Sequence, residues 1–264
     1  MLRQDACNAV QRILKKYKRV RDAAFDPVAF FRLVEADKHD DSSDSGSSST
    51  SELQPPPFEA VVISPSDSPL KVYLGSVSDA MYPAALKDHN IVAILNVAAR
   101  QCSDVQRIKK ISKSESDKIL SQWERVEFRE SWYSSHLDCP EFRYLTVEAE
   151  DHPRYKIVDD FESCFSFLEN IEVGPHSNEP CVLIHCMQGL NRSAAVCVGW
   201  LIKRFGMSVT EAVEQVASKR NGVLSNRAFA KQIIDWAIPA AQVSSDEKPI
   251  SRNVLVIGNV IERI

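Results

Sequence analysis

The stretch CVLIHCMQGLNRS, residues 181–193, combines a buried strand, a short loop and the beginning of a helix. The apolar run 181–184, which follows Pro180, is typical of a buried strand. The apolar residues after Arg192 predict a helix of the core. A histidine-cysteine pair at the end of the strand and an arginine at the beginning of the helix therefore lie at the two ends of one tight loop.

This loop has the features of an anion cradle. A loop that leads into a helix N-terminus presents free backbone N–H groups, and the helix dipole adds partial positive charge, so the concavity binds a phosphate-like dianion. Arg192 can hold two phosphate oxygens with its planar fork, and the same positive field lowers the pKa of the Cys186 thiol. A thiolate beneath a cradled phosphoryl group is a nucleophile for phosphoryl transfer. The competing interpretation is a structural cysteine before an ordinary core helix.

The composition describes a globular protein. The 264 residues are 44% hydrophobic and 26% charged, and the net charge of −4 gives no reason to expect nucleic acid as a partner. No apolar run is long enough for a membrane span, and the first residues lack the apolar core of a secretory signal. The seven cysteines are odd in number and form no CxxC pair, which favours free thiols in a reducing compartment. We therefore expect a cytoplasmic protein, and the nucleus is also compatible with this pattern.

The chain divides into four parts. Residues 1–36 form an N-terminal extension with a basic amphipathic helix, which can bind an anionic membrane surface or a partner protein, or pack on its own domain. Residues 37–57 are acidic and rich in serine and proline, as disordered linkers are. The folded domain is expected at 58–238. The tail 239–264 contains a β-rich run that can add an edge strand or bind a partner.

Within the folded domain, strands and helices alternate. A strand–helix–strand unit at 72–97 predicts parallel pairing. We therefore predict an α/β fold with a central, mostly parallel twisted sheet flanked by helices, and with the phosphate-binding loop between a central strand and a helix. Residues 100–140 are poorly patterned and are interpreted as an insertion with one or two helices. The expected strands are 60–63, 72–74, 91–97, 142–147 and 181–184, and the expected helices are 80–88, 157–169, 192 onward, 208–219 and 225–236.

A second chemical site follows the strand at 142–147. Cleavage of a phosphate monoester requires a proton for the leaving oxygen, and a carboxylic acid on a loop above the cradle can supply it. Glu148, Glu150 and Asp151 all follow this strand, and their spacing alone does not distinguish them. The competing interpretation is that these acidic residues belong to an ordinary solvent-exposed turn.

These features together resemble the dual-specificity branch of the cysteine-dependent protein phosphatases. The signature loop carries the resemblance, and so do the phrases at 72–76 and 94–98 and the closing segment at 225–236, so it covers about 60–238. It implies a metal-independent phosphoric monoester hydrolase without a cofactor, which acts on phosphotyrosine and phosphoserine/threonine of protein substrates. It also implies a role for each of several residues: Cys186 as nucleophile, Arg192 and the loop residues Met187, Gln188, Gly189, Leu190 and Asn191 as phosphate ligands, Asp151 rather than Glu150 as general acid, Ser193 as hydrogen-bond donor to the sulfur, and His185 and Asn96 as supporting residues.

The chain departs from the family pattern inside the loop. Gln188 and Asn191 stand where the pattern commonly has alanine and serine. An asparagine before the arginine also occurs in the similar loop of cysteine-dependent RNA 5′-triphosphatases, which cut an anhydride and can dispense with the acid. A phosphoprotein-binding pseudophosphatase is a further alternative. Cys181 and Cys197 flank the site in sequence and can either trap an oxidised Cys186 or remain inert buried thiols.

Overall fold

The structure is a computed structural model that describes residues 3–18, 58–104, 126–172 and 179–238. Its strands are β1 Val61–Val62, β2 Lys71–Ser76, β3 Ile91–Asn96, β4 Arg143–Thr146 and β5 Cys181–Cys186. Its helices are α1 Arg3–Lys16, α3 Val77–Ala80, α4 Pro83–Asp88, α7 Glu130–Leu137, η1 Ile157–Asp160, α8 Phe161–Glu172, α9 Arg192–Phe205, α10 Val209–Lys219 and α11 Arg227–Ala237.

The strands form one sheet in the order β1-β2-β5-β3-β4. Strand β5 lies in the middle and runs parallel to both neighbours, so that Leu183 is in register with Tyr73 on one side and Ile94 on the other. Only the pairing of β1 with β2 is antiparallel among the described strand pairs. This arrangement confirms the predicted mostly parallel α/β sheet and places the end of β5 at its centre.

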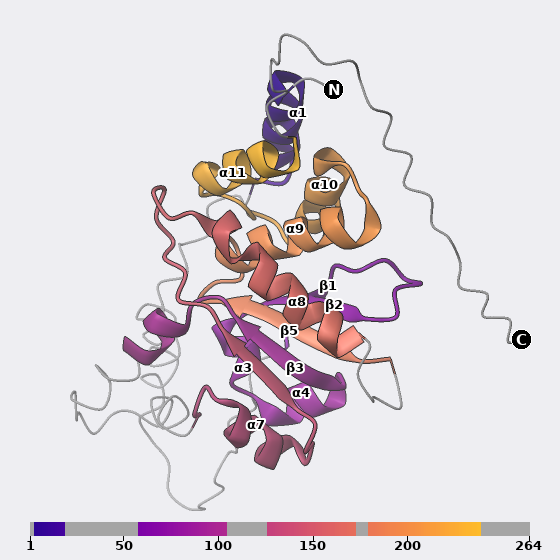
Figure 1. Cartoon of the computed structure of the whole chain (residues 1–264), viewed down its shortest axis with the longest axis vertical. Helices are drawn as coiled ribbons and strands as arrows, with labels where there is room; N and C mark the ends of the chain where they lie inside the picture. The colour runs from indigo at the N-terminus through magenta and orange to yellow at the C-terminus, as the bar shows by residue number, and fades with distance from the viewer. Residues whose placement is uncertain (1–2, 19–57, 105–125, 173–178, 239–264) are drawn as a thin grey trace, which may run out of the picture.

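Both faces of the sheet are covered, as Figure 1 shows. All residues of β5 are buried, and the side chains at 181–184 alternate between two hydrophobic clusters. Val182 and Ile184 pack in the cluster that contains α8, α9, α10 and α11. Cys181 and Leu183 pack in the cluster that contains α3, α4 and α7. Burial on both faces explains why the sequence of β5 is continuously apolar rather than alternating.

The N-terminal helix α1 packs on the same body. Ala6 and Val10 are buried in the cluster of α10 and α11. The Arg3 guanidinium donates to the backbone oxygens of Ile238 and Asp235 at 2.6 and 3.1 Å. The apolar face of α1 therefore covers the folded domain, so the described part of the basic extension predicted for 1–36 packs on that domain. The predicted linker 37–57 and tail 239–264 lie outside the described residues.

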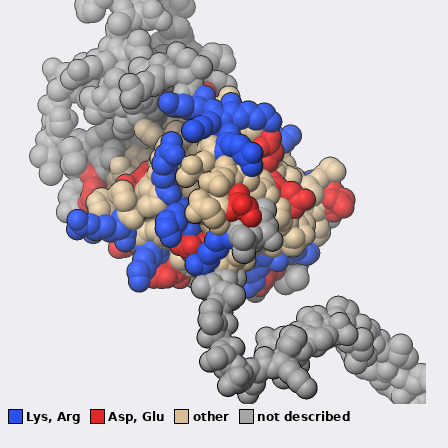
Figure 2. Space-filling model, turned by 90° about the horizontal axis from the view of Figure 1, so that it is seen from above, with Lys and Arg blue, Asp and Glu red and all other residues tan. Residues whose placement is uncertain are grey.

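The outer surface near α1 carries charges of both signs. Seen from the end of the molecule where α1 lies, Lys and Arg side chains are interspersed with Asp and Glu (Figure 2). Two cations of α1 are already paired, since Arg3 faces Asp235 at 3.6 Å and Lys16 faces Glu214 at 2.7 Å. In the described part of the chain, no helix is long and apolar enough to cross a membrane.

Several boundaries differ from those expected. The helix expected at 80–88 is divided into α3 and α4, because Pro83 opens α4 and restricts the residue before it. The helix expected at 157–169 begins as the short 3-10 turn η1. The helix expected at 208–219 is α10, which begins with a capping box formed by Ser208 and Glu211. Of the predicted insertion at 100–140, residues 105–125 lie outside the described part, and α7 lies in the remainder.

Candidate active site

The loop 187–191 joins the carboxyl end of β5 to the first turn of α9, and its carbonyl groups are held from outside. The oxygen of Met187 accepts from the Val77 N–H at 3.3 Å, and the oxygen of Leu190 accepts from the Leu224 N–H at 2.8 Å. The oxygen of Gln188 accepts from Arg220 Nη2 at 3.1 Å. Three carbonyls of the loop are thus engaged by other segments, and this arrangement suits a loop whose N–H groups serve an anion.

Gly189 allows the loop to approach strand β2. Its φ is +69°, and a Cβ atom built there would lie 2.5 Å from the backbone oxygen of Gly75. Any other residue would meet both the strain of the left-handed region and a backbone that cannot move aside. The glycine is therefore required by the tight seating of the loop on the sheet.

Cys186 lies at the base of this loop and is 2% exposed. Its Sγ accepts a hydrogen bond from Ser193 Oγ at 3.2 Å. Burial by itself opposes the thiolate, but the Arg192 charge, the Ser193 hydroxyl and the N–H groups of Ser193 and Gly189 together lower the pKa of Cys186. The site therefore favours the nucleophilic form of this cysteine.

Arg192 is buried at the beginning of α9, with 3% exposure. Its Nη1 donates to the backbone oxygen of Ala149 at 3.1 Å, and its Nη2 donates to Gln101 Oε1 at 2.8 Å. Its Nε is buried and has no partner among the described residues. A buried donor without a partner costs free energy, so an anion that accepts from it would be bound favourably.

These residues surround one cavity of about 170 Å³. Its lining combines the phosphate loop 187–191 with the acid segment 148–151 after β4 and with the helical residues 99–104 after β3. The lining residues are Gln101, Asp151, Cys186, Met187, Gln188, Leu190, Asn191 and Arg192. Nucleophile, cation and carboxylate thus face the same space. In the part of the chain that the structure describes, no three His, Cys, Asp or Glu side chains are grouped so as to hold a metal ion.

The structure separates two of the candidate acids, Asp151 and Glu150. Asp151 lines the cavity, and its two oxygens accept from Asn191 Nδ2 at 2.9 Å and from Asn226 Nδ2 at 3.1 Å. Glu150 points instead to Arg100, with 3.4 Å between Arg100 Nη1 and Glu150 Oε1 on the exposed surface. The geometry therefore supports Asp151 as the residue that can reach a leaving oxygen.

The two supporting residues lie below the site. His185 is fully buried, and burial lowers its pKa to about 4, so its ring is neutral near pH 7. The Asn96 side chain binds the residues that follow β3 and the neighbouring strand β4 rather than the phosphate loop. Its Oδ1 accepts from the Ala98 N–H at 2.9 Å, and its Nδ2 donates to the Tyr144 hydroxyl at 3.0 Å. Asn96 thus braces the turn that leads to Gln101.

Four residues at this site were not among the sequence candidates. Gln101 lies in the region interpreted as an insertion, and no pattern marks it. Arg220 and Leu224 each donate one hydrogen bond to a carbonyl oxygen of the loop, and the sequence contains no periodic signal for such contacts. Asn226 carries a detectable signal, because it stands directly before the last helix and its side chain accepts from the Ala228 N–H as an N-cap.

Comparison with known proteins identifies the family. The family model described as the dual specificity phosphatase catalytic domain matches residues 72–238. The chain belongs to the dual specificity phosphatase family. The matched range includes the whole cavity described above.

Relatives of this chain occur in plants and animals. Dual specificity protein phosphatase 1 of Arabidopsis thaliana is 27% identical over 164 residues, which cover 62% of this chain and 64% of that protein. Dual specificity protein phosphatase 16 of Homo sapiens is 32% identical over 97 residues, covering 37% of this chain and 14% of that protein. The matches therefore span less than two thirds of these relatives' own length. The solved structure of human DUSP28 is 20% identical with a TM-score of 0.48, covering 70% of this chain and 97% of that one.

Proposed function

We propose that this chain is a protein phosphatase that hydrolyses phosphotyrosine and phosphoserine/threonine through a cysteinyl-phosphate intermediate. The observation that carries the proposal is the convergence on one cavity of three groups. They are a cysteine of lowered pKa, a buried arginine whose Nε has no described partner, and a carboxylate. Family membership supports the same reaction class.

In the first step, the Cys186 thiolate attacks phosphorus, and the S–P bond forms as the P–O bond to the substrate breaks. Asp151 gives its proton to the departing oxygen, and the Arg192 guanidinium with the loop N–H groups stabilises the charge on the phosphoryl oxygens. In the second step, a water gives a proton to Asp151 and attacks phosphorus, and the S–P bond breaks. The Ser193 hydroxyl, 3.2 Å from the sulfur, stabilises the thiolate that departs.

The alternative reaction is RNA 5′-triphosphatase activity, which the asparagine before Arg192 suggests. Hydrolysis of an anhydride releases a phosphate leaving group that needs no proton. Asp151 faces the cavity, whereas an anhydride-cleaving enzyme has no use for a general acid. This supports phosphate monoesters as substrates, and the retained Cys186, Arg192, Ser193 and Asp151 support turnover rather than phosphoprotein binding alone.

The proposal is tested with the full chain and a small aryl phosphate, in the presence of a chelator. We expect chelator-resistant hydrolysis that Cys186→Ser reduces by at least about 10⁴-fold, because the weakly acidic hydroxyl is not ionised in the same field. Phosphotyrosine and phosphothreonine peptides and triphosphate-ended RNA are then compared. Wild-type protein that folds but hydrolyses none of the monoesters would overturn the proposal, and RNA as the preferred substrate would favour the alternative.

The remaining assignments belong to the same proposal. A thiolate nucleophile needs a reducing compartment, which supports a cytoplasmic location. The catalytic domain is proposed at 58–238, with the linker 37–57 and the tail 239–264 outside it. Phosphorylated protein is the proposed partner. Because the apolar face of α1 is buried, binding to an anionic membrane or a partner protein would have to use the outward cations of that helix.

A further inference from the structure

Asn191 occupies the N-cap position of α9 but does not cap the helix. An asparagine at this position commonly accepts a hydrogen bond from an N–H of the first turn. Here the side chain makes no such bond, and its φ and ψ are −113° and −72°. The N–H groups of the first turn are thus left for a bound phosphate, and the carboxamide is directed elsewhere.

The contacts of the Asn191 side chain define the orientation of its amide. Its Oδ1 accepts from the Asn226 N–H at 3.0 Å and from Ser225 Oγ at 3.0 Å. Its Nδ2 donates to Asp151 Oδ2 at 2.9 Å. A backbone N–H can only donate and a carboxylate can only accept, so exchanging the amide oxygen and nitrogen would break both of these bonds. The donor of Asn191 therefore faces the acid.

Asn226 forms a second connection to the same carboxylate. Its Nδ2 donates to Asp151 Oδ1 at 3.1 Å, while its Oδ1 accepts from the Ala228 N–H at 3.3 Å. Both oxygens of Asp151 are consequently held by carboxamides, one from the phosphate loop and one from the beginning of α11. The phosphate loop, the acid segment after β4 and α11 meet in this cluster of Asp151, Asn191, Ser225 and Asn226.

We propose that Asn191 is a positioning residue that holds the general acid over the nucleophile. This role rests on the proposed phosphatase function. Because Asn191 immediately precedes Arg192 in the phosphate loop, its bond to Asp151 couples the position of the acid to the cradle. A serine at this position can accept from the Asn226 N–H, but its shorter side chain does not extend to Asp151.

A positioning role for the acid has a signature in the choice of leaving group. Phenol leaves poorly as an anion, so hydrolysis of phenyl phosphate depends on proton donation in the transition state. Dinitrophenolate leaves well without a proton, so hydrolysis of 2,4-dinitrophenyl phosphate depends on the acid much less. Damage to the phosphate loop itself would lower kcat/KM for both substrates by a similar factor. The ratio of kcat/KM for phenyl phosphate to that for 2,4-dinitrophenyl phosphate therefore distinguishes loss of acid positioning from loss of phosphate binding.

The test measures kcat/KM for both substrates in wild type, Asn191→Ser and Asp151→Asn. We expect Asn191→Ser to lower the phenyl-to-dinitrophenyl ratio at least about ten-fold, toward the larger decrease given by Asp151→Asn. The double variant should show no further decrease in this ratio beyond Asp151→Asn, because both changes act through one carboxyl group. Inhibition by inorganic phosphate should change less than about three-fold if the cradle is intact.

Two further variants complete the design. Ser225→Ala removes a partner of Asn191 that does not touch Asp151, and we expect it to leave the ratio within about two-fold of wild type. Asn191→Asp keeps a side chain of the same size and replaces the donor by an acceptor, so it should lower the ratio even where Asn191→Ser folds poorly. Equal loss on both substrates in the Asn191 variants would overturn the positioning role and leave the phosphatase function standing. A folded wild type that hydrolyses neither substrate would overturn both.

Discussion

The two ends of strand β5 carry the same residue type in opposite chemical states. Cys186, at the carboxyl end, has a lowered pKa although it is fully buried. Cys181, at the amino end of the same strand, has a raised pKa, first because of burial and then because of the Glu179 charge, against a smaller effect of Lys71. Burial is common to both cysteines, so the difference comes from the groups around them.

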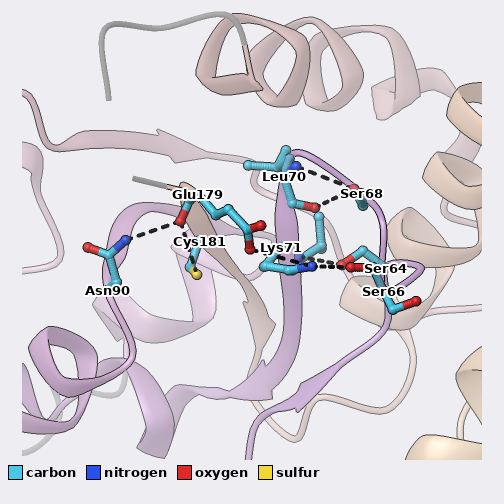
Figure 3. Close-up of polar contacts among 9 residues, drawn as sticks. Ser64, Ser66, Ser68, Leu70, Lys71, Asn90, Glu179 and Cys181 are labelled. Atoms are coloured by element: carbon cyan, nitrogen blue, oxygen red, sulfur yellow. Dashed lines mark hydrogen bonds and ion pairs between the residues drawn. The ribbon is translucent and has the colours of Figure 1, made fainter. Parts of the chain in front are cut away.

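At the amino end of β5, the polar groups form hydrogen bonds and an ion pair with one another (Figure 3). The Lys71 ammonium donates to the Ser66 backbone oxygen at 2.6 Å and lies 3.6 Å from the Glu179 carboxylate. Asn90 Nδ2 donates to the Glu179 backbone oxygen at 3.1 Å, and the Cys181 thiol contacts that oxygen at 3.7 Å. These contacts connect the amino ends of β2, β3 and β5, and the raised pKa of Cys181 keeps its thiol protonated near pH 7.

At the carboxyl end, by contrast, donors are directed at a cavity. Arg192 uses its two terminal nitrogens on Ala149 and Gln101 and keeps a buried Nε without a described partner. A fixed cation with a free donor stabilises a thiolate and, in turn, a phosphoryl group that the thiolate attacks. The chemistry at each end of β5 therefore depends on which polar groups remain available, more than on burial or residue type.

The largest difference between the two ends of β5 is expected from their cations, Arg192 and Lys71. Arg192→Lys should lower kcat/KM by about 10³-fold, because a lysine presents a point charge and cannot contact Ala149, Gln101 and phosphate together. The matched variant Lys71→Arg, at the other end of the sheet, should stay within about two-fold. Steady-state kinetics on an aryl phosphate measures both. A similar decrease of kcat/KM in the two variants would contradict a specific role of the Arg192 guanidinium.

The acid segment provides the second prediction. Asp151→Asn should lower kcat/KM on phenyl phosphate by about 10²-fold, since an amide of the same size can accept only one of the two hydrogen bonds from Asn191 and Asn226 and gives no proton. The neighbouring variant Glu150→Gln should remain within about two-fold, because that residue points to Arg100 on the surface. We measure kcat/KM as a function of pH in both variants. The decrease of kcat/KM at high pH, which reflects loss of the proton from the general acid, should be absent only in Asp151→Asn. Absence of that decrease in Glu150→Gln would assign the acid to Glu150.

The sequence was informative where one local pattern decides the structure. The apolar run of β5, the loop and the beginning of α9 are consecutive in the chain, so their placement follows from strand and helix signals. The pairing of Asp151 with Asn226 and of Arg192 with Gln101 joins residues 75 and 91 positions apart, and such contacts have no local signature. The division of the helix expected at 80–88 shows the same limit, since Pro83 was compatible both with one helix and with the beginning of a second.

The third prediction addresses the two cysteines directly. At about pH 6.5, well below the ordinary thiol pKa of about 8.5, iodoacetate should modify Cys186 at least about 20-fold faster than Cys181, because only the thiolate reacts. As the pH rises, modification of Cys186 should level off first and that of Cys181 last, following the lowered and raised pKa values. Mass spectrometry of the digested protein measures both sites. Inorganic phosphate should protect Cys186, and equal rates at low pH would contradict the lowered pKa.

The smallest effect concerns the hydroxyl beside the nucleophile. Ser193→Ala removes the hydrogen bond to the Cys186 sulfur, so the thiolate becomes a poorer leaving group when water attacks the cysteinyl phosphate. We expect the second step to slow by about ten-fold, while the first step changes less because the cavity and Arg192 remain in place. Rapid mixing with an activated aryl phosphate should then show a burst of phenolate about equal to the enzyme concentration, followed by slow turnover. Cys181→Ser is the matched control at the other end of β5 and should show wild-type kinetics. A uniform decrease without a burst in Ser193→Ala would mean that the hydroxyl acts mainly on the pKa of Cys186, and alkylation of that variant would then slow at low pH.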